Sequence, residues 1–171
     1  MNTKYSEHNT PKTPATAFKI AVQTADFDQN TLYQQLRVAS SVGGIVTFTG
    51  LVREFQAPII TAASPGTAPL TLEHYPGMTE QVLERIAHDA GTRWPLEAVT
   101  IIHRVGELTA GEQIVFVGVA SAHRQAAFEA CHFVIDLLKT RAPFWKKEGN
   151  RWVDAKQSDQ SAAKRWLEDY A

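Results

Sequence analysis

The residues best suited to chemistry lie in one short basic and aromatic stretch. From Lys139 to Arg151, five of thirteen residues are basic and one, Glu148, is acidic. The letters APFW stand between Arg141 and Lys146. A bend fixed by proline and walled by aromatic rings could keep the lysines partly dry, and desolvation beside other cations lowers the pKa of a lysine. Such lysines can serve as acids, bases or amine nucleophiles towards a small anionic ligand.

The same stretch has a simpler interpretation. Lys139 falls in the last turn of a predicted helix, where each cation gains about 0.3–1 kcal/mol from the helix dipole. The sequence by itself leaves both interpretations open.

Further cations stand at the ends of predicted elements. Arg53 ends a strand, where a side chain either projects into a cleft or is simply solvated, and His123-Arg124 open a helix, where backbone N–H groups favour anions. Lys139 lies about 22 Å along the same helix, at about 1.5 Å per residue. One small anion cannot contact both ends. His123 and Arg124 are therefore either unrelated to the lysines or complete the site of a neighbouring subunit, which predicts a homodimer.

Three other groups that could be reactive have structural interpretations. His103-Arg104 lie in the middle of a predicted strand, and we interpret both as structural. Cys131 is the only cysteine, and its place beside an apolar helix stripe is more typical of a buried core residue than of a nucleophile. The histidines lack metal-ligand spacing, so we expect no metal and no cofactor.

The composition limits the class of protein. The 171 residues carry a net charge of −1 with a pI near 6.6, whereas proteins that bind nucleic acid usually carry a basic excess. The basic cluster therefore suits a small anion better than a duplex. One cysteine, no apolar signal segment and no eighteen-residue apolar run predict a cytoplasmic protein without a membrane contact.

The hydrophobic pattern predicts one α+β domain over 18–171, with a mixed or antiparallel sheet, after a disordered tail over 1–17. The predicted strands cover 18–23, 41–54, 70–75, 96–108, 112–121 and 152–155, with 96–108 and 112–121 as an antiparallel pair. The predicted helices cover 30–40, 78–94, 123–140 and 158–170, stopped at Gly91 in the second and by Pro143 in the third. Residues 54–69 contain three prolines and predict a mobile loop.

Six motifs resemble one protein family. In chain order they are GGIVTFTGLVRE, LTLEHYPGM, VTIIHRVGEL, GEQIVFVGVASAHRQAAFEA, LKTRAPFWKKE and DQSAAKRW. They resemble the large, catalytic subunits of molybdopterin synthase, and the resemblance extends over nearly all of residues 18–167 except the loop 54–69. The resemblance implies an α/β hammerhead fold with an additional antiparallel sheet.

The resemblance also implies a function and partners. Members of this family are sulfurtransferases that convert cyclic pyranopterin monophosphate (precursor Z) to molybdopterin by installing two dithiolene sulfurs. The sulfur arrives as a thiocarboxylate on the C-terminal Gly-Gly of a small ubiquitin-like subunit. Two large subunits form a homodimer at the centre of a heterotetramer.

Residue roles follow from the resemblance position by position. The motif LKTRAPFWK implies catalytic roles for Lys139 and Lys146. The implied substrate contacts are Arg53, His123, Arg124, Lys147, Glu148 and Phe48, the last as a wall of the pocket or of the channel for the partner's tail. Lys156 stands where the family leads us to expect arginine, and lysine would weaken a bidentate contact.

Two alternatives stay open at this point. A non-catalytic module could bind a nucleotide or RNA through Arg53 and the basic cluster over 139–151, with an affinity that falls steeply with salt. Cys131 could instead carry a persulfide, in which case Cys131→Ser would be inactive.

Overall fold

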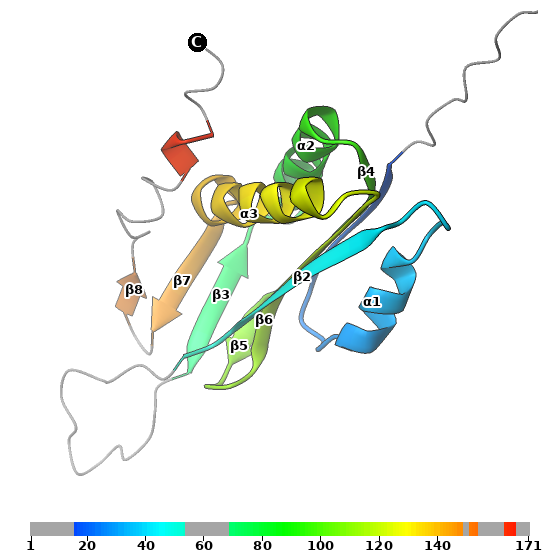
Figure 1. Ribbon diagram of the computed structural model, residues 1–171. Helices are drawn as coiled ribbons and strands as arrows, with labels where there is room; N and C mark the ends of the chain where they lie inside the picture. Colours follow the sequence, from blue (N-terminus) through cyan, green and yellow to red (C-terminus); the bar gives the residue numbers. More distant parts are fainter. Residues whose placement is uncertain (1–15, 54–68, 149–150, 154–162, 167–171) are drawn as a thin grey trace, which may run out of the picture.

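A computed structural model describes residues 16–53, 69–148, 151–153 and 163–166 of the chain. Its elements are β1 (Ala17–Gln23), α1 (Gln29–Leu36), β2 (Gly44–Leu51), β3 (Leu70–His74), α2 (Met78–Arg93), β4 (Leu96–Arg104), β5 (Gly106–Leu108), β6 (Gln113–Ser121), α3 (Arg124–Arg141), β7 (Phe144–Glu148) and β8 (Arg151–Val153). They form two four-stranded sheets, in the orders β1-β4-β6-β2 and β5-β3-β7-β8 (Figure 1). The predicted α+β class with an additional antiparallel sheet is confirmed.

The first sheet is mixed and is covered on both faces. β1 runs parallel to β4, and β4 and β2 run antiparallel to β6, as predicted for 96–108 with 112–121. Because side chains alternate along a strand, Val99 and Val117 pack towards α2 and α3, whereas Ile102 and Phe116 pack towards α1. Figure 1 shows α1 on the opposite side of this sheet from α2 and α3.

Two predicted boundaries were wrong for physical reasons. The strand predicted over 96–108 divides at Val105, because Gly106 adopts a φ of 91° and turns the chain into β5 of the second sheet. Gly91 does not stop α2, which continues to Arg93. A Cβ at Gly91 would lie 3.1 Å from the ring of Phe18, so this glycine instead permits close packing of helix and strand.

Other boundaries shift less. α1 ends at Leu36, its last buried residue, rather than at residue 40. β7 was not predicted at all, and it becomes a central strand of the second sheet.

Parts of the prediction fall on residues that lie outside the described ranges. These are the loop 54–69 except its last residue, the tail 1–17 except Thr16 and Ala17, the last two residues of the strand 152–155, and the helix 158–170 except 163–166. Thr16 already belongs to the fold, since its hydroxyl donates to the carbonyl oxygen of Leu96 at 2.8 Å. In the described ranges, no helix is long and apolar enough to cross a membrane.

Candidate active site

A proline bend between α3 and β7 carries the two lysines predicted to be catalytic. α3 ends before Pro143, which lacks a backbone N–H and disfavours a helical conformation in the residue before it. Ala142 is already extended, and its carbonyl oxygen accepts from the N–H of Phe144 at 2.9 Å. Lys139 lies in the last turn of α3 and is exposed, whereas Lys146 is half-buried on β7.

Two contacts from other elements fix this bend. The hydroxyl of Thr79, fully buried at the start of α2, donates to the carbonyl oxygen of Pro143 at 3.3 Å and accepts from the N–H of Tyr75 at 3.2 Å. The ring of His103 stacks on Phe144, with centroids 3.9 Å apart and planes inclined by 18°. Burial lowers the pKa of His103 to about 4, so this ring is neutral at pH 7. The bend is therefore attached to α2 and to β4 of the first sheet.

The two lysines of β7 lie on opposite faces of the second sheet. Lys146 pairs with the buried Leu72 of β3, whereas Lys147 pairs with the exposed Trp152 of β8. Because side chains alternate along a strand, Lys146 shares the inner face with Phe144. The amine of Lys147 lies 5.8 Å from the ring centroid of Trp152 on the outer face.

Two of the remaining predicted site residues, His123 and Arg124, lie at the far end of α3 from the bend. His123 is the N-cap of α3 and Arg124 its first residue, and both are exposed. α3 is one continuous helix, so about 22 Å separate Arg124 from Lys139 along its axis, and one chain does not bring them together. Arg53, also exposed, follows the end of β2. Two further predicted contacts are Glu148, the last residue of β7, and Lys156, which lies outside the described residues.

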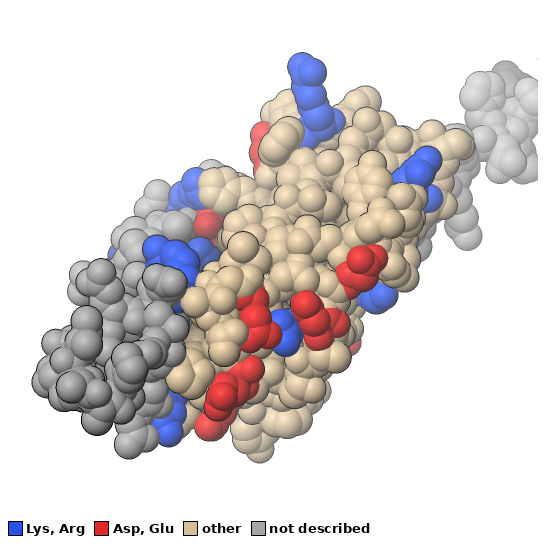
Figure 2. Space-filling view, turned by 90° about the horizontal axis from the view of Figure 1, so that it is seen from below, with Lys and Arg blue, Asp and Glu red and all other residues tan. Residues whose placement is uncertain are grey.

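Charge is unevenly distributed on the face shown in Figure 2. Lys and Arg lie beside the grey atoms at the end that carries β7 and β8, while Asp and Glu surround a basic residue near the middle. Arg104, only 7% exposed, lies in acidic surroundings: its guanidinium is 3.3 Å from Glu112 and 3.6 Å from Asp26. The structural interpretation of Arg104 is confirmed.

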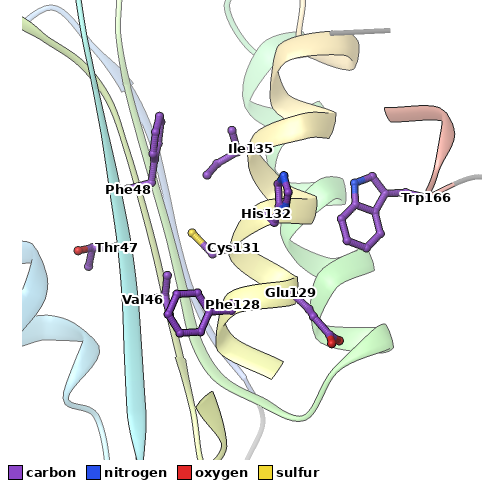
Figure 3. Close-up of a pocket in the computed structure, with 9 residues that line it drawn as sticks. All are labelled: Val46, Thr47, Phe48, Phe128, Glu129, Cys131, His132, Ile135 and Trp166. Carbon is purple, nitrogen blue, oxygen red and sulfur yellow. The ribbon is translucent and has the colours of Figure 1, made fainter. Parts of the chain in front are cut away.

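An open groove of about 410 Å³ lies between β2 and α3 (Figure 3). Phe48 of β2 and Ile135 of α3 line one end, and Val46 and Phe128 line the other. The complete lining is Val46, Thr47, Phe48, Phe128, Glu129, Cys131, His132, Ile135 and Trp166. This mostly apolar lining suits an extended chain segment better than a phosphate group.

Comparison with known proteins assigns the family. The family model described as MoaE protein matches residues 22–141. The chain belongs to the MoaE family. It is 53% identical over 152 residues to the molybdopterin synthase catalytic subunit of Escherichia coli (strain K12). The aligned region covers 86% of this chain and 97% of that protein.

Solved structures share the fold. The molybdopterin cofactor biosynthesis protein E from Burkholderia multivorans superposes with a TM-score of 0.74 at 46% identity, covering 88% of this chain and 97% of that one. A chain of the Helicobacter pylori complex of subunits 1 and 2 of molybdopterin-converting factor shares the fold at a TM-score of 0.61 and 22% identity, covering 82% and 90%.

The MoaE family assignment confirms the resemblance drawn from the motifs. The chain is accordingly a catalytic subunit of molybdopterin synthase, a sulfur-transferring enzyme of molybdenum-cofactor biosynthesis. The alternative of a non-catalytic nucleotide- or RNA-binding module is not supported by these relatives.

The single cysteine of this MoaE chain is poorly suited to carry sulfur. Cys131 faces the groove from α3 but is only 3% exposed. Burial raises the pKa of its thiol to about 12, and the thiolate is the form that reacts. The prediction of a buried core cysteine is confirmed.

Sequence reasoning missed a cluster that attaches residues 163–166 to α3 of this MoaE chain. Asp136, only 7% exposed, accepts a hydrogen bond from the indole N–H of Trp166 at 2.8 Å and another from Arg165. Asp136 lies one helical turn before Lys139, and Trp166 also lines the groove. The available signal was an acidic residue inside the apolar run FVIDLL.

Proposed function

We propose that this chain transfers two sulfur atoms to precursor Z and so forms the dithiolene of molybdopterin. The sulfur comes from the thiocarboxylate at the C-terminal Gly-Gly of a small ubiquitin-like subunit. The observation that carries this proposal is the fixed bend at Pro143, with Lys139 before it and Lys146 after it. Precursor Z bears a phosphate and a polar pterin, so cations at a bend partly walled by aromatic rings match its charge. We also propose a cytoplasmic location, where a lone cysteine stays reduced.

In this proposal the two lysines have different tasks. Lys139 stabilises charge or moves protons as the thiocarboxylate attacks the pterin side chain, and Lys146 holds the acyl or phosphate oxygens. Arg53 anchors the phosphate. Because the donor brings activated sulfur, the chain contributes orientation and charge and needs no nucleophilic cysteine. Further proposed contacts are Phe48, Lys147, Glu148 and Lys156.

We propose a homodimer at the centre of a heterotetramer. Arg124 and Phe128 are one turn apart on α3 and share a face, and Phe128 is 63% exposed although it is apolar. A second copy that covers Phe128 would bring Arg124, with His123, to the neighbouring lysine site, which a single chain does not do. The exposure of Lys139 in the isolated chain also favours a pocket that closes only on assembly.

The small subunit has a proposed place on this dimer. Its extended C-terminal tail would enter along the apolar groove lined by Phe48, between β2 and α3. The Helicobacter pylori chain that shares this fold was solved in a complex of two subunits, which agrees with a two-subunit assembly here.

Reconstitution tests the proposed function. The purified chain is mixed with precursor Z and a thiocarboxylated small subunit, and the release of molybdopterin is measured over time. We expect product only when the chain and the thiocarboxylate are both present, with the unmodified C-terminal carboxylate as the matched control. Absence of product, under conditions in which the Escherichia coli relative is active, would refute the proposal.

A further inference from the structure

The two proposed catalytic lysines belong to different parts of the fold. Lys139 is on α3, which packs on the first sheet, and Lys146 is on β7 of the second sheet. Their relative position therefore depends on how the sheets are joined. Besides the hydrogen bond from Thr79 to Pro143, the joint includes three side chains that pack against the hydrophobic clusters of both sheets: Val22, Ile114 and Phe144.

His103 contacts Phe144 at this joint and also closes the end of β4. The ring is only 6% exposed, and its Nδ1 lies 2.8 Å from the carbonyl oxygen of Arg104, the last residue of β4. Because a carbonyl oxygen can only accept, Nδ1 carries the proton and donates it. The same ring stacks on Phe144, the first residue of β7. One side chain thus connects the end of the first sheet to the start of the strand that carries Lys146.

The place of Lys146 follows from that of Phe144. The two residues are on the same face of β7, two positions and roughly 7 Å apart. On the neighbouring strand, His74 pairs with Phe144, and its Nε2 is 3.5 Å from Glu80. Because Phe144 and Lys146 lie on the same face of β7, a shift of the Phe144 ring would be passed along that face to Lys146.

We propose that His103 is a positioning residue for sulfur transfer, which holds Lys146 in place relative to Lys139 through its stack on Phe144. This inference rests on the proposed roles of the two lysines. It predicts that position 103 requires a flat ring as well as apolar volume.

A side chain that only fills space would behave differently. In that case leucine and phenylalanine at position 103 should support turnover equally, because cores tolerate apolar residues of similar volume. If the stack positions Lys146, leucine should impair turnover and phenylalanine should restore it. A displacement of a catalytic group by about 1 Å can lower the rate by about 100-fold.

The test compares His103→Leu and His103→Phe in the reconstituted synthase. The control is His88→Ala, because exposed His88 on α2 also contacts a phenylalanine ring, Phe18, at 4.3 Å between centroids but with the planes inclined by 45°. We expect His103→Leu to lower kcat by about ten- to a hundredfold, with KM for precursor Z changed by less than about twofold. His103→Phe should stay within about threefold of the wild type, and His88→Ala should be unchanged.

A second measurement follows the Lys146 amine directly. The folded protein is labelled with a soluble N-hydroxysuccinimide ester and digested, and peptide mass spectrometry follows the acylation of Lys146 itself; this rate should change in His103→Leu and not in His103→Phe. Folded His103→Leu with a wild-type kcat, or with a wild-type acylation rate, would overturn the inference. Equal losses of kcat in the two variants would also overturn it.

The remaining outcomes are also decisive. If His103→Leu does not fold, His103→Phe decides: wild-type kcat and acylation support the inference, and a tenfold loss overturns it. A Lys146→Ala variant with wild-type turnover would refute the proposed role of Lys146 instead, and the acylation rates would still report whether His103 positions that amine.

Discussion

Lys146 and Lys147 are adjacent in the chain but lie on opposite faces of β7. Lys146 shares the inner face with Leu72 and Phe144, whereas Lys147 lies over the ring of Trp152 on the outer face. A ligand small enough to bind at the proline bend would therefore reach these two amines from different sides of the sheet. The two adjacent lysines therefore lie in different environments.

This difference predicts unequal effects of removing each amine. Lys146→Ala should lower kcat/KM for molybdopterin formation at least about tenfold more than Lys147→Ala, because Lys146 is the proposed catalytic amine and Lys147, on the opposite face, is only a proposed substrate contact. Steady-state kinetics with both variants in parallel measures the ratio. Equal losses would show that both amines act on the substrate despite their opposite faces.

Lys139→Ala should abolish dithiolene formation while the fold and partner binding persist. The side chain is exposed at the end of α3, so its removal costs little stability. Lys19→Ala is the control, since Lys19 is exposed on β1 and its amine donates a hydrogen bond to the side chain of Gln35 at 2.6 Å. Molybdopterin release, circular dichroism and size-exclusion chromatography are the measurements, and wild-type turnover would end the assignment of Lys139.

Cys131→Ser should retain near-normal turnover, within about twofold, because a buried thiol with a pKa near 12 supplies little thiolate at pH 7. A buried hydroxyl without a partner costs about 1–3 kcal/mol, so Cys131→Ala serves as a second variant if the serine protein is unstable. The assay is reconstituted molybdopterin formation. Loss of activity in both folded variants would revive the persulfide carrier.

His103 should make the free energy of unfolding depend on pH. Its pKa is about 4 when folded and about 6.5 in an unfolded chain, so between these values only the unfolded chain binds the proton. The contribution of neutral His103 to the free energy of unfolding is fully present above about pH 6.5. It falls by up to about 3 kcal/mol as the pH drops towards 4. His74, on β3 beside Glu80, is the titratable neighbour that further opposes protonation of His103.

Denaturant titrations of the wild type and of His103→Phe between about pH 4 and pH 7 measure this dependence. The phenylalanine variant should lose less stability on acidification than the wild type. Parallel curves for the two proteins would show that His103 does not titrate in this way.

Asp136→Asn should destabilise the attachment of residues 163–166. Asparagine can still accept from Trp166, but it carries no charge to pair with Arg165, and we expect a loss of about 1–3 kcal/mol. Thermal and urea unfolding measure the change. Glu84→Gln, on the exposed part of α2, is the control, and equal stability of the two variants would contradict the prediction.

Local patterns were sufficient to predict most of the first sheet. In β2, Val46 and Phe48 pack towards α3 while Ile45 packs towards α1, so the alternation in the sequence reflects two covered faces. The parallel pairing of β1 with β4 left no local signal, because it joins residues about eighty positions apart. Gly91 was misread because its role depends on the Phe18 ring of a distant strand.

The site was predicted less completely. The basic and aromatic composition drew attention to Lys139 and Lys146, yet Pro143 and the charges concealed a strand in the middle of the second sheet. The contacts of His103 with Phe144 and of Asp136 with Trp166 join segments far apart in sequence, so no spacing rule could have found them.

The position of β2 has a practical consequence. Among the described strands it pairs with β6 alone, so its other border presents a row of backbone donors and acceptors next to the groove. Such an unpaired edge can form backbone hydrogen bonds with any extended peptide. The purified chain without its partner should aggregate at high concentration, and co-expression with the small subunit should prevent this aggregation.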